Sequence, residues 1–568
     1  MPFPDPPDPL PPTPTVEIDA KLARLTENKH AWLAVPIPQR IAYLERIQAG
    51  LREVAEGWVA NGAKLKGLAP GDPLVGEEWL AGPMTTARNV RVLIEALRAN
   101  GQPKHGGIET RGTGQHVVRV FPLTLMDRLM LSGYTAEIWI EPDKAPTQGA
   151  VYRERPQQGK VALVLGGGNV SSIPPMDVLY KLFVEDEVVL LKMNPVNEHV
   201  GPRIEAAFRS LVDDGFLAVV YGGADVGAYA AGHSQVDTLH VTGSDRTYDA
   251  IVWGSDPEER ARRKAANDPV NKRPFSAELG CVTPILVVPG SWSDLDIEYQ
   301  ARHVAGMITQ NASFNCNAAK VLVMARTWLH RLPFLEALHD ELRKAPPRKA
   351  YYPGAQGRYE AFLSAYPNAI KLGAAAEGVV PWTVLPGVPA NGSEYALCNE
   401  AFCGVVAEVT LDLDQAGVMP TPTGFLEEAV RFANEACWGS LSTTILIDRD
   451  TAIECAYELD KAIDALRYGG IGVNCWPGVL YGLCTTTWGA YPGHPPTDIR
   501  SGVGVVHNGL LFDHPQKSVV HAPFRPRPAP PYVGGVKHLE ELGRRSFEWE
   551  LAPTWKNFLR LAWTGLKG

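Results

Sequence analysis

Residues 160–172 read KVALVLGGGNVSS, a short apolar run that passes directly into a glycine-rich turn. Between residues 159 and 244 such runs alternate with helical patterns, the runs being Lys160–Leu165, Glu187–Lys192, Leu217–Tyr221 and Thr238–Thr242. This alternation is typical of βαβ units and predicts an α/β fold with a doubly wound parallel sheet. Glycines such as Gly168 let the backbone approach a ligand at a helix N-terminus, although Ser171 replaces the last glycine of the Gly-x-Gly-x-x-Gly fingerprint.

A second stretch, from Glu278 to Lys320, carries the residues best suited to chemistry. It holds Glu278 in a Glu-Leu-Gly sequence, then an apolar run, a helical pattern and a polar loop that ends at Cys316 before another buried strand. A thiolate is a strong nucleophile, its thioester hydrolyses readily, and a carboxylate takes protons from thiol or water. The positions predict Cys316 as nucleophile and Glu278 as base. The alternative is a buried structural thiol and a surface carboxylate.

The remaining segments predict a chain of several parts. Helical patterns occupy Ile18–Leu33, Arg40–Ala63 and Thr85–Ala99, and alternating residues at Thr135–Glu141 and Gly149–Glu154 predict a β-hairpin. Residues 396–474 predict a second α/β unit. We expect a proline-rich arm (1–17), N-terminal helices and a dinucleotide-binding domain (18–130 and 155–278), a catalytic domain (279–490), and a hairpin and C-terminal oligomerisation or tail region (131–154 and 491–568).

The composition excludes several classes of protein. The 568 residues are 45% hydrophobic and 21% charged, which is ordinary for a globular chain of two or three domains. The net charge of −9 argues against a nucleic-acid surface, which needs basic patches. Eight irregularly spaced cysteines and the lack of a secretory signal predict a cytoplasmic protein with reduced thiols. The histidines show no metal-ligand spacing, so no metal is expected.

Several short motifs occur in an order that resembles the aldehyde dehydrogenase superfamily, of which the chain looks like a divergent member. Glu278-Leu279-Gly280 and Cys316 resemble the family's base and nucleophile motifs, and Asn169 matches the asparagine of Pro-Trp-Asn-Phe. Further matches are Lys192 at a strand end, Val236–Ser244 ending in Thr-Gly-Ser, Glu400 and Phe402 in place of Glu-Ile-Phe-Gly-Pro, and Asn434 and Asn474.

The resemblance implies a reaction, in which an aldehyde is oxidised to an acid with NAD or NADP through a thiohemiacetal and a thioester on Cys316. Glu278 would activate the hydrolytic water, and Asn169 would stabilise the oxyanion, a contact worth ~3–4 kcal/mol. The residues implied to bind the cofactor are Lys192, Gly243, Ser244, Glu400, Phe402 and Gly168.

Departures from the family pattern leave alternatives open. Pro195 stands where the family often has an acid that excludes the NADP 2′-phosphate, so we expect both cofactors to be accepted unless Glu198 takes over that role. The family's late Gly-Arg-Glu is absent, because Val505 and Val506 follow Gly504. One alternative is an acyl-CoA reductase on the same fold, in which coenzyme A replaces water. Another is a catalytically silent binding or structural homologue.

The resemblance also implies a homodimer or homotetramer, with the predicted hairpin in the interface. The C-terminal segment Pro553–Gly568 combines aromatic and basic residues at helical spacing. We expect a helix packed on its own domain or on another subunit. The alternative is a weak association of this helix with a membrane surface.

Overall fold

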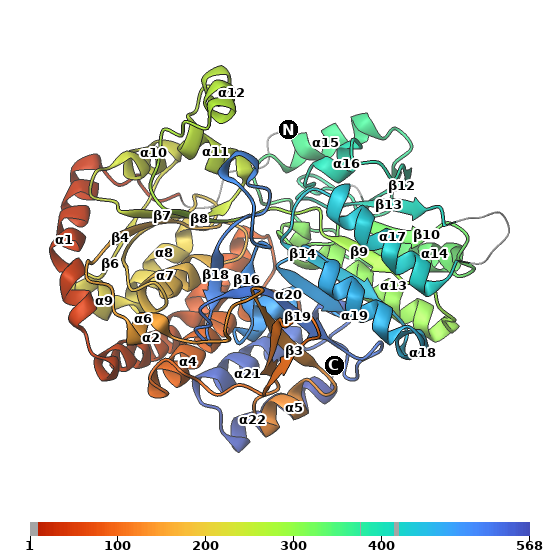
Figure 1. Cartoon of the computed structure of the whole chain (residues 1–568), viewed down its shortest axis with the longest axis horizontal. Helices are drawn as coiled ribbons and strands as arrows, with labels where there is room; N and C mark the ends of the chain where they lie inside the picture. The colour runs from red at the N-terminus through yellow and green to blue at the C-terminus, as the bar shows by residue number, and fades with distance from the viewer. Residues whose placement is uncertain (1–8, 375, 414–419, 568) are drawn as a thin grey trace.

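The computed structural model of the chain describes residues 9–374, 376–413 and 420–567, which fold around two large β-sheets and a short two-stranded one (Figure 1). The smaller large sheet has the order β17-β8-β7-β4-β5-β6. Its strands β4 to β8 run parallel, and β17 is antiparallel. The bounds are β4 Val161–Leu165, β5 Val188–Lys192, β6 Leu217–Val220, β7 Thr238–Gly243, β8 Phe275–Leu279 and β17 Gly502–Val503. The predicted α/β fold with a parallel sheet is confirmed.

Helices connect and cover this sheet. Within it, β4 and β5 are buried along their whole length, which explains their unbroken apolar runs. The connecting helices are α7 Ile173–Phe183, α8 Gly201–Ala207, α9 Arg209–Asp213, α10 Ala224–Gly232, α11 Asp245–Trp253 and α12 Pro257–Ala266. The N-terminal helices are α1 Thr15–Ala34, α2 Ile37–Leu65, α3 Val75–Trp79, the π-helix η1 Leu80–Met84 and α4 Thr85–Arg98. Three of these, α1, α2 and α4, occupy the ranges predicted as helical.

The larger sheet has eleven strands in the order β1-β2-β3-β19-β15-β14-β9-β10-β13-β12-β11. Its parallel centre is β15, β14, β9, β10 and β13, and helices α13, α14, α17 and α19 cover it (Figure 1). These helices span Asp294–Thr309, Arg331–Lys344, Pro422–Glu435 and Ala456–Ala465. The strands are β1 Ile108–Thr110, β2 His116–Phe121, β3 Thr135–Ile140, β9 Pro284–Val287, β10 Val321–Ala325, β11 Ile370–Lys371, β12 Thr383–Val388, β13 Val405–Leu411, β14 Ser442–Leu446, β15 Gly470–Val473 and β19 Pro515–His521.

The predicted hairpin is wrong. Strand β3 forms, but it lies between β2 and β19, and residues Ala150–Arg153 form the short helix α6 instead of a second strand. Gly149 has a left-handed φ of 64°, and the backbone N–H of Ala150 donates to the Asp513 carboxylate at 2.8 Å. These two features start a helical turn where the sequence alternation predicted an extended strand.

The C-terminal part ties the N-terminal helices to the rest of the molecule. After β16 (Thr487–Gly489), β18 (Val505–Asn508) and β19, the chain forms η5 (Pro531–Val533), α21 (Leu539–Leu551) and α22 (Trp555–Lys567). Buried Glu550 on α21 accepts ion-pair contacts from Arg88 at 2.6 Å and Arg91 at 2.8 Å, both on α4. Figure 1 shows α21 and α22 at the lower edge beside α5 (Leu125–Met130).

Candidate functional site

Cys316 lies on a turn between α13 and β10 that the chain enters in an uncommon conformation. Asn311, Ala312 and Ser313 all have left-handed φ values, of 54°, 54° and 68°. Such values are unfavourable for residues other than glycine, so the turn needs support from its surroundings. The Asn311 amide supplies it by donating to the carbonyl oxygens of Asn169 (3.0 Å) and Phe314 (3.2 Å).

Glu278 is the last but one residue of β8 and is buried beside Cys316. The indole N–H of Trp488 donates to its Oε1 at 3.2 Å, and the Cys316 thiol is its other hydrogen-bond partner. Burial raises the pKa of Glu278 to about 8, against the lowering effect of those two hydrogen bonds. Burial and the adjacent Glu278 hold the pKa of the Cys316 thiol well above its ordinary value. The pair is therefore a neutral thiol against a carboxyl group that titrates near physiological pH, which suits a general base.

Asn169 follows β4 and is tied to the same turn. Its side-chain amide donates to the Phe314 carbonyl at 2.8 Å, which uses one of the two amide hydrogens. Its own carbonyl accepts from Asn311 and from the Tyr351 hydroxyl, the latter at 3.0 Å. Asn169 and the turn before Cys316 are thus held in one position relative to each other.

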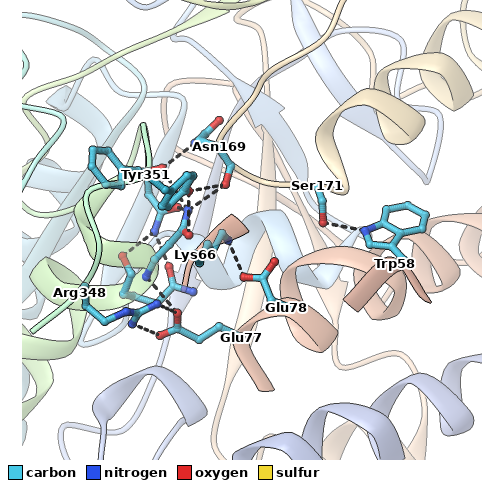
Figure 2. A network of polar contacts seen from close by, with 12 residues as sticks. Trp58, Lys66, Glu77, Glu78, Asn169, Ser171, Arg348 and Tyr351 are labelled. Carbon is cyan, nitrogen blue, oxygen red and sulfur yellow. Dashed lines mark hydrogen bonds and ion pairs between the residues drawn. The ribbon is translucent and has the colours of Figure 1, made fainter. Parts of the chain in front are cut away.

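Two buried ion pairs support this arrangement from the N-terminal helices (Figure 2). Arg348 donates to Glu77 at 2.8 Å, and the Glu77 carboxylate accepts the backbone N–H of Asn311 at 3.3 Å. Lys66 pairs with Glu78 at 2.5 Å and lies 5.1 Å from the centre of the Tyr351 ring. Sequence reasoning did not find these residues, because Glu77 and Arg348 are 271 positions apart and neither stands in a recognisable motif.

A cavity of about 1370 Å³ opens at the carboxyl ends of the parallel strands β4, β5 and β7. All nine residues predicted for the site line it: Asn169, Glu278, Cys316, Gly168, Lys192, Gly243, Ser244, Glu400 and Phe402. Ligands bind at this edge of open parallel sheets. The structure therefore brings together side chains that are dispersed over more than two hundred positions of sequence.

The walls of this cavity fit an anionic dinucleotide. Helices α10 and α11 begin on it, with Gly223, Ala224, Ser244 and Asp245 among its lining residues, and a helix N-terminus attracts phosphate groups. Gly227 lines this wall next to Lys192, whose Cε atom lies 4.0 Å from where a side-chain carbon at Gly227 would be.

Lys192 and Glu400 mark two further parts of the cavity. Burial lowers the pKa of Lys192 to about 8, against the raising effect of Glu198 and Asp225. Glu198 does not line the cavity; its carboxylate accepts the backbone N–H of Leu10 at 2.8 Å. Glu400 pairs with Lys320 at 3.3 Å and packs over Gly280, where an added side-chain carbon would lie 1.8 Å from the carboxylate. A larger residue at position 280 would displace the Glu400 carboxylate from this position.

A second cavity, of about 220 Å³, lies on the other side of the reactive pair. Cys316, Glu278 and Thr242 line both cavities, so the thiol lies where the two meet. The second cavity is bounded mainly by apolar and aromatic residues, among them Leu80, Met84, Val170, Ile173, Trp476, Val479, Tyr481, Trp488, Val506, Tyr532 and Leu539. Three of its lining residues, Lys66, Glu77 and Glu78, belong to the two ion pairs described above.

A buried Asp–His cluster that the sequence did not reveal also borders the second cavity. The Asp177 carboxylate, on α7, contacts His507 Nε2 at 3.2 Å and His240 Nε2 at 3.4 Å, and accepts the Thr242 hydroxyl at 3.1 Å. Contacts with the two imidazoles outweigh burial and hold the pKa of Asp177 below its ordinary value. In the β16–β18 ladder His507 lies directly opposite Trp488, the residue whose indole N–H donates to Glu278.

Comparison with known proteins gives a match of part of the chain to one family model, and solved structures with a similar fold. The sequence model described as "Aldehyde dehydrogenase family" matches residues 182–354. The crystal structure of an NAD-dependent aldehyde dehydrogenase from Sinorhizobium meliloti is 18% identical to this chain, with a TM-score of 0.62. The alignment covers 93% of this chain and 92% of the other. The aldehyde dehydrogenase KauB from Pseudomonas aeruginosa is 18% identical with a TM-score of 0.60, covering 89% and 88%.

A third similar structure is the NADP-dependent glyceraldehyde-3-phosphate dehydrogenase from Bacillus halodurans C-125. It is 15% identical to this chain with a TM-score of 0.60, and the alignment covers 90% of this chain and 92% of the other. A search of curated protein sequences gave no significant match.

Proposed function

We propose that the protein oxidises an apolar aldehyde to a carboxylic acid with NAD or NADP as acceptor. The premise is the predicted resemblance to the aldehyde dehydrogenase superfamily, which is confirmed by sequence over residues 182–354 and by fold over most of the chain. The observation that carries the proposal is the position of Cys316, hydrogen-bonded to Glu278 where a cofactor-sized cavity meets an apolar one.

The cofactor would lie in the larger cavity. Lys192, Gly243, Ser244, Gly168, Glu400 and Phe402 would hold it, with the helix N-termini facing its phosphate groups. When bound, the nicotinamide accepts a hydride. Similar structures include both an NAD-dependent and an NADP-dependent enzyme, and Pro195 offers no charge against a 2′-phosphate, so both cofactors are expected to bind.

The covalent steps use the residues around Cys316. Glu278 takes the thiol proton, and the sulfur adds to the carbonyl carbon to give a thiohemiacetal. The second amide hydrogen of Asn169 and the Cys316 backbone N–H would stabilise the oxyanion. Loss of hydride leaves a thioester on Cys316. Glu278 then deprotonates water, which displaces the sulfur, releases the acid and restores the thiol.

His507 is the proposed acceptor of the proton that Glu278 collects, because it lies opposite Trp488, whose indole N–H donates to Glu278. His507 Nε2 lies 3.2 Å from the Asp177 carboxylate, whereas Nδ1 has no hydrogen-bond partner within the described residues. In the tautomer whose Nε2–H donates to Asp177, the lone pair of Nδ1 is free to accept a proton. The carboxylate of Asp177 would stabilise the resulting imidazolium. In this proposal His507 takes the proton from Glu278 and resets the base for the next step.

The second cavity defines the class of aldehyde. A cavity of about 150 Å³ binds benzene in another protein, so about 220 Å³ accommodates an aryl group or a medium-length alkyl chain. Among the described residues that line it, the only lysine or arginine is Lys66, which is already paired with Glu78, and Asp177 adds a carboxylate. An anionic substrate group would therefore enter without a counter-charge, which is unfavourable in a buried site. We therefore expect uncharged aromatic or alkyl aldehydes to be preferred over phosphorylated or carboxylated ones.

The test is to incubate purified protein with neutral and anionic aldehydes of matched size, each cofactor in turn, with and without coenzyme A. Formation of NADH or NADPH with neutral aldehydes is expected. The Cys316→Ala variant should lose this activity and retain cofactor binding, with Cys455→Ala, a thiol that lines neither cavity, as the matched control. Full activity in Cys316→Ala would refute the assignment. Acyl-CoA as the product, or reduction of acyl-CoA, would establish the reductase alternative.

A further inference from the structure

Exposed apolar side chains gather on two helices at one edge of the molecule. Of the 16 large hydrophobic residues that are exposed in the described part of the chain, six lie on α5 and α22. They are Leu125, Leu129, Trp555, Leu559, Trp563 and Leu566, each between 52% and 77% exposed. A cluster of this kind marks a site of interaction, whereas single exposed residues do not. We call these six residues the apolar patch.

Helix α22 has two different apolar faces. One packs inward, where Phe558 and Leu561 join Trp549 of α21 and the methionines of α5 in a small core. The other carries Trp555, Leu559 and Leu566, which recur at the spacing of a helical stripe and are exposed. The inner face already anchors the helix, so folding of this chain does not require the outer stripe to be apolar.

Cations border the apolar patch. Lys556 and Arg560 lie beside the outer stripe of α22, and Arg128 lies between Leu125 and Leu129 on α5. None of these three forms an ion pair with any described residue. The described side chains of the two helices include one acid, Asp127, and its carboxylate accepts the backbone N–H groups of Leu123 and Thr124 at the start of α5. In a chain of net charge −9, this surface is cationic.

We propose that the apolar patch and its bordering cations dock the protein on a membrane surface rich in anionic lipid. Tryptophan and leucine beside lysine and arginine suit the boundary between head groups and acyl chains. A second copy of this chain fits less well, because a contact of the patch with itself would offer Lys556 and Arg560 no carboxylate except Asp127, which already accepts two backbone N–H groups. Among the described helices, none is long and apolar enough to cross a bilayer.

The test is co-sedimentation of the full chain with vesicles of phosphatidylcholine alone and with vesicles that also contain phosphatidylglycerol. Binding to the anionic vesicles, weakened by salt, is expected, together with a blue shift of tryptophan fluorescence. Lys556→Gln and Arg560→Gln should each weaken binding about fivefold, since a cation near an anionic surface contributes ~1 kcal/mol. The Leu559→Ser, Leu566→Ser double variant should weaken it at least tenfold.

A matched control keeps the test specific. Leu329→Ser with Leu332→Ser removes two leucines of similar exposure at the start of α14 and should leave vesicle binding unchanged. Aldehyde oxidation of a water-soluble substrate should be equal in all these variants, because the patch lies outside the catalytic cavities. Absence of binding, or equal loss in the control, would overturn the proposal. The proposal would also be overturned if the wild type bound no vesicles and formed a dimer that the Leu559→Ser, Leu566→Ser variant could not form. That result would assign the patch to contact with a second copy of the chain.

Discussion

Replacing Glu278 with glutamine should stabilise the folded protein, by an amount that grows with pH. Burial raises the pKa of Glu278 from 4.5 to about 8. Between these values the unfolded chain has released the proton and the folded chain still holds it, so the free energy of unfolding falls by 1.36 kcal/mol per pH unit as the pH rises. The destabilisation is absent below pH 4.5, roughly 3 kcal/mol at pH 7 and roughly 5 kcal/mol above pH 8.

Glutamine keeps the shape of the neutral acid and still accepts the Trp488 hydrogen bond, so the variant escapes this destabilisation. Denaturant unfolding of both proteins near pH 5, 7 and 8.5, followed by circular dichroism, measures the difference. Glu109→Gln, on the exposed strand β1, is the matched control and should show no growing difference. A Glu278→Gln variant that is less stable than wild type, or whose advantage does not change with pH, would show that Glu278 is already ionised in the folded protein at pH 7. The raised pKa and the reasoning built on it would then be wrong.

Three further outcomes follow from the site. In tryptophan-fluorescence titrations, the affinities of the wild-type protein for NAD and NADP should differ by no more than about a hundredfold, or 2.7 kcal/mol. A much larger preference for NAD would mean that the Glu198 carboxylate leaves the Leu10 N–H and faces the ribose. Tyr351→Phe removes the hydroxyl that lies 3.0 Å from both the Asn169 carbonyl oxygen and Asn311 Oδ1. It should lower kcat about fivefold without changing cofactor affinity. An unchanged kcat would mean that the hydroxyl does not position Asn169. His507→Gln keeps a hydrogen-bond donor for Asp177 but removes the basic nitrogen. It should slow steady-state turnover about 100-fold while the initial burst of reduced cofactor remains. Loss of the burst would mean that His507 acts in acylation instead.

The sequence predicted those parts of the fold that depend on local patterns. The apolar run 160–165 corresponds to β4 and the run 187–192 to β5, because a strand buried on both faces leaves an unbroken apolar signal. The hairpin at 131–154 was wrong for the opposite reason. The neighbours of β3 are β2 and β19, and β19 comes from almost four hundred residues later. Alternation in one segment does not identify its partner strand.

The candidate site divides in the same way. Glu278, Cys316 and Lys192 could be named because each stands in a short motif, and the cavity brings them together. Asp177 and His507 could not be named, since they are 330 positions apart and meet only through the packing of α7 against β18. The left-handed turn at Asn311 was equally invisible, because it depends on Glu77 and Tyr351 from other parts of the chain.

The contact between Cys316 and Glu278 joins the two large sheets. Glu278 belongs to β8 of the six-stranded sheet, and Cys316 precedes β10 of the eleven-stranded sheet. A small rotation of one sheet against the other would separate thiol and carboxyl group without breaking a single strand pairing. Heat or mild denaturant is therefore expected to inactivate the protein before its secondary structure melts, so that thermal inactivation measures how firmly the two halves hold together.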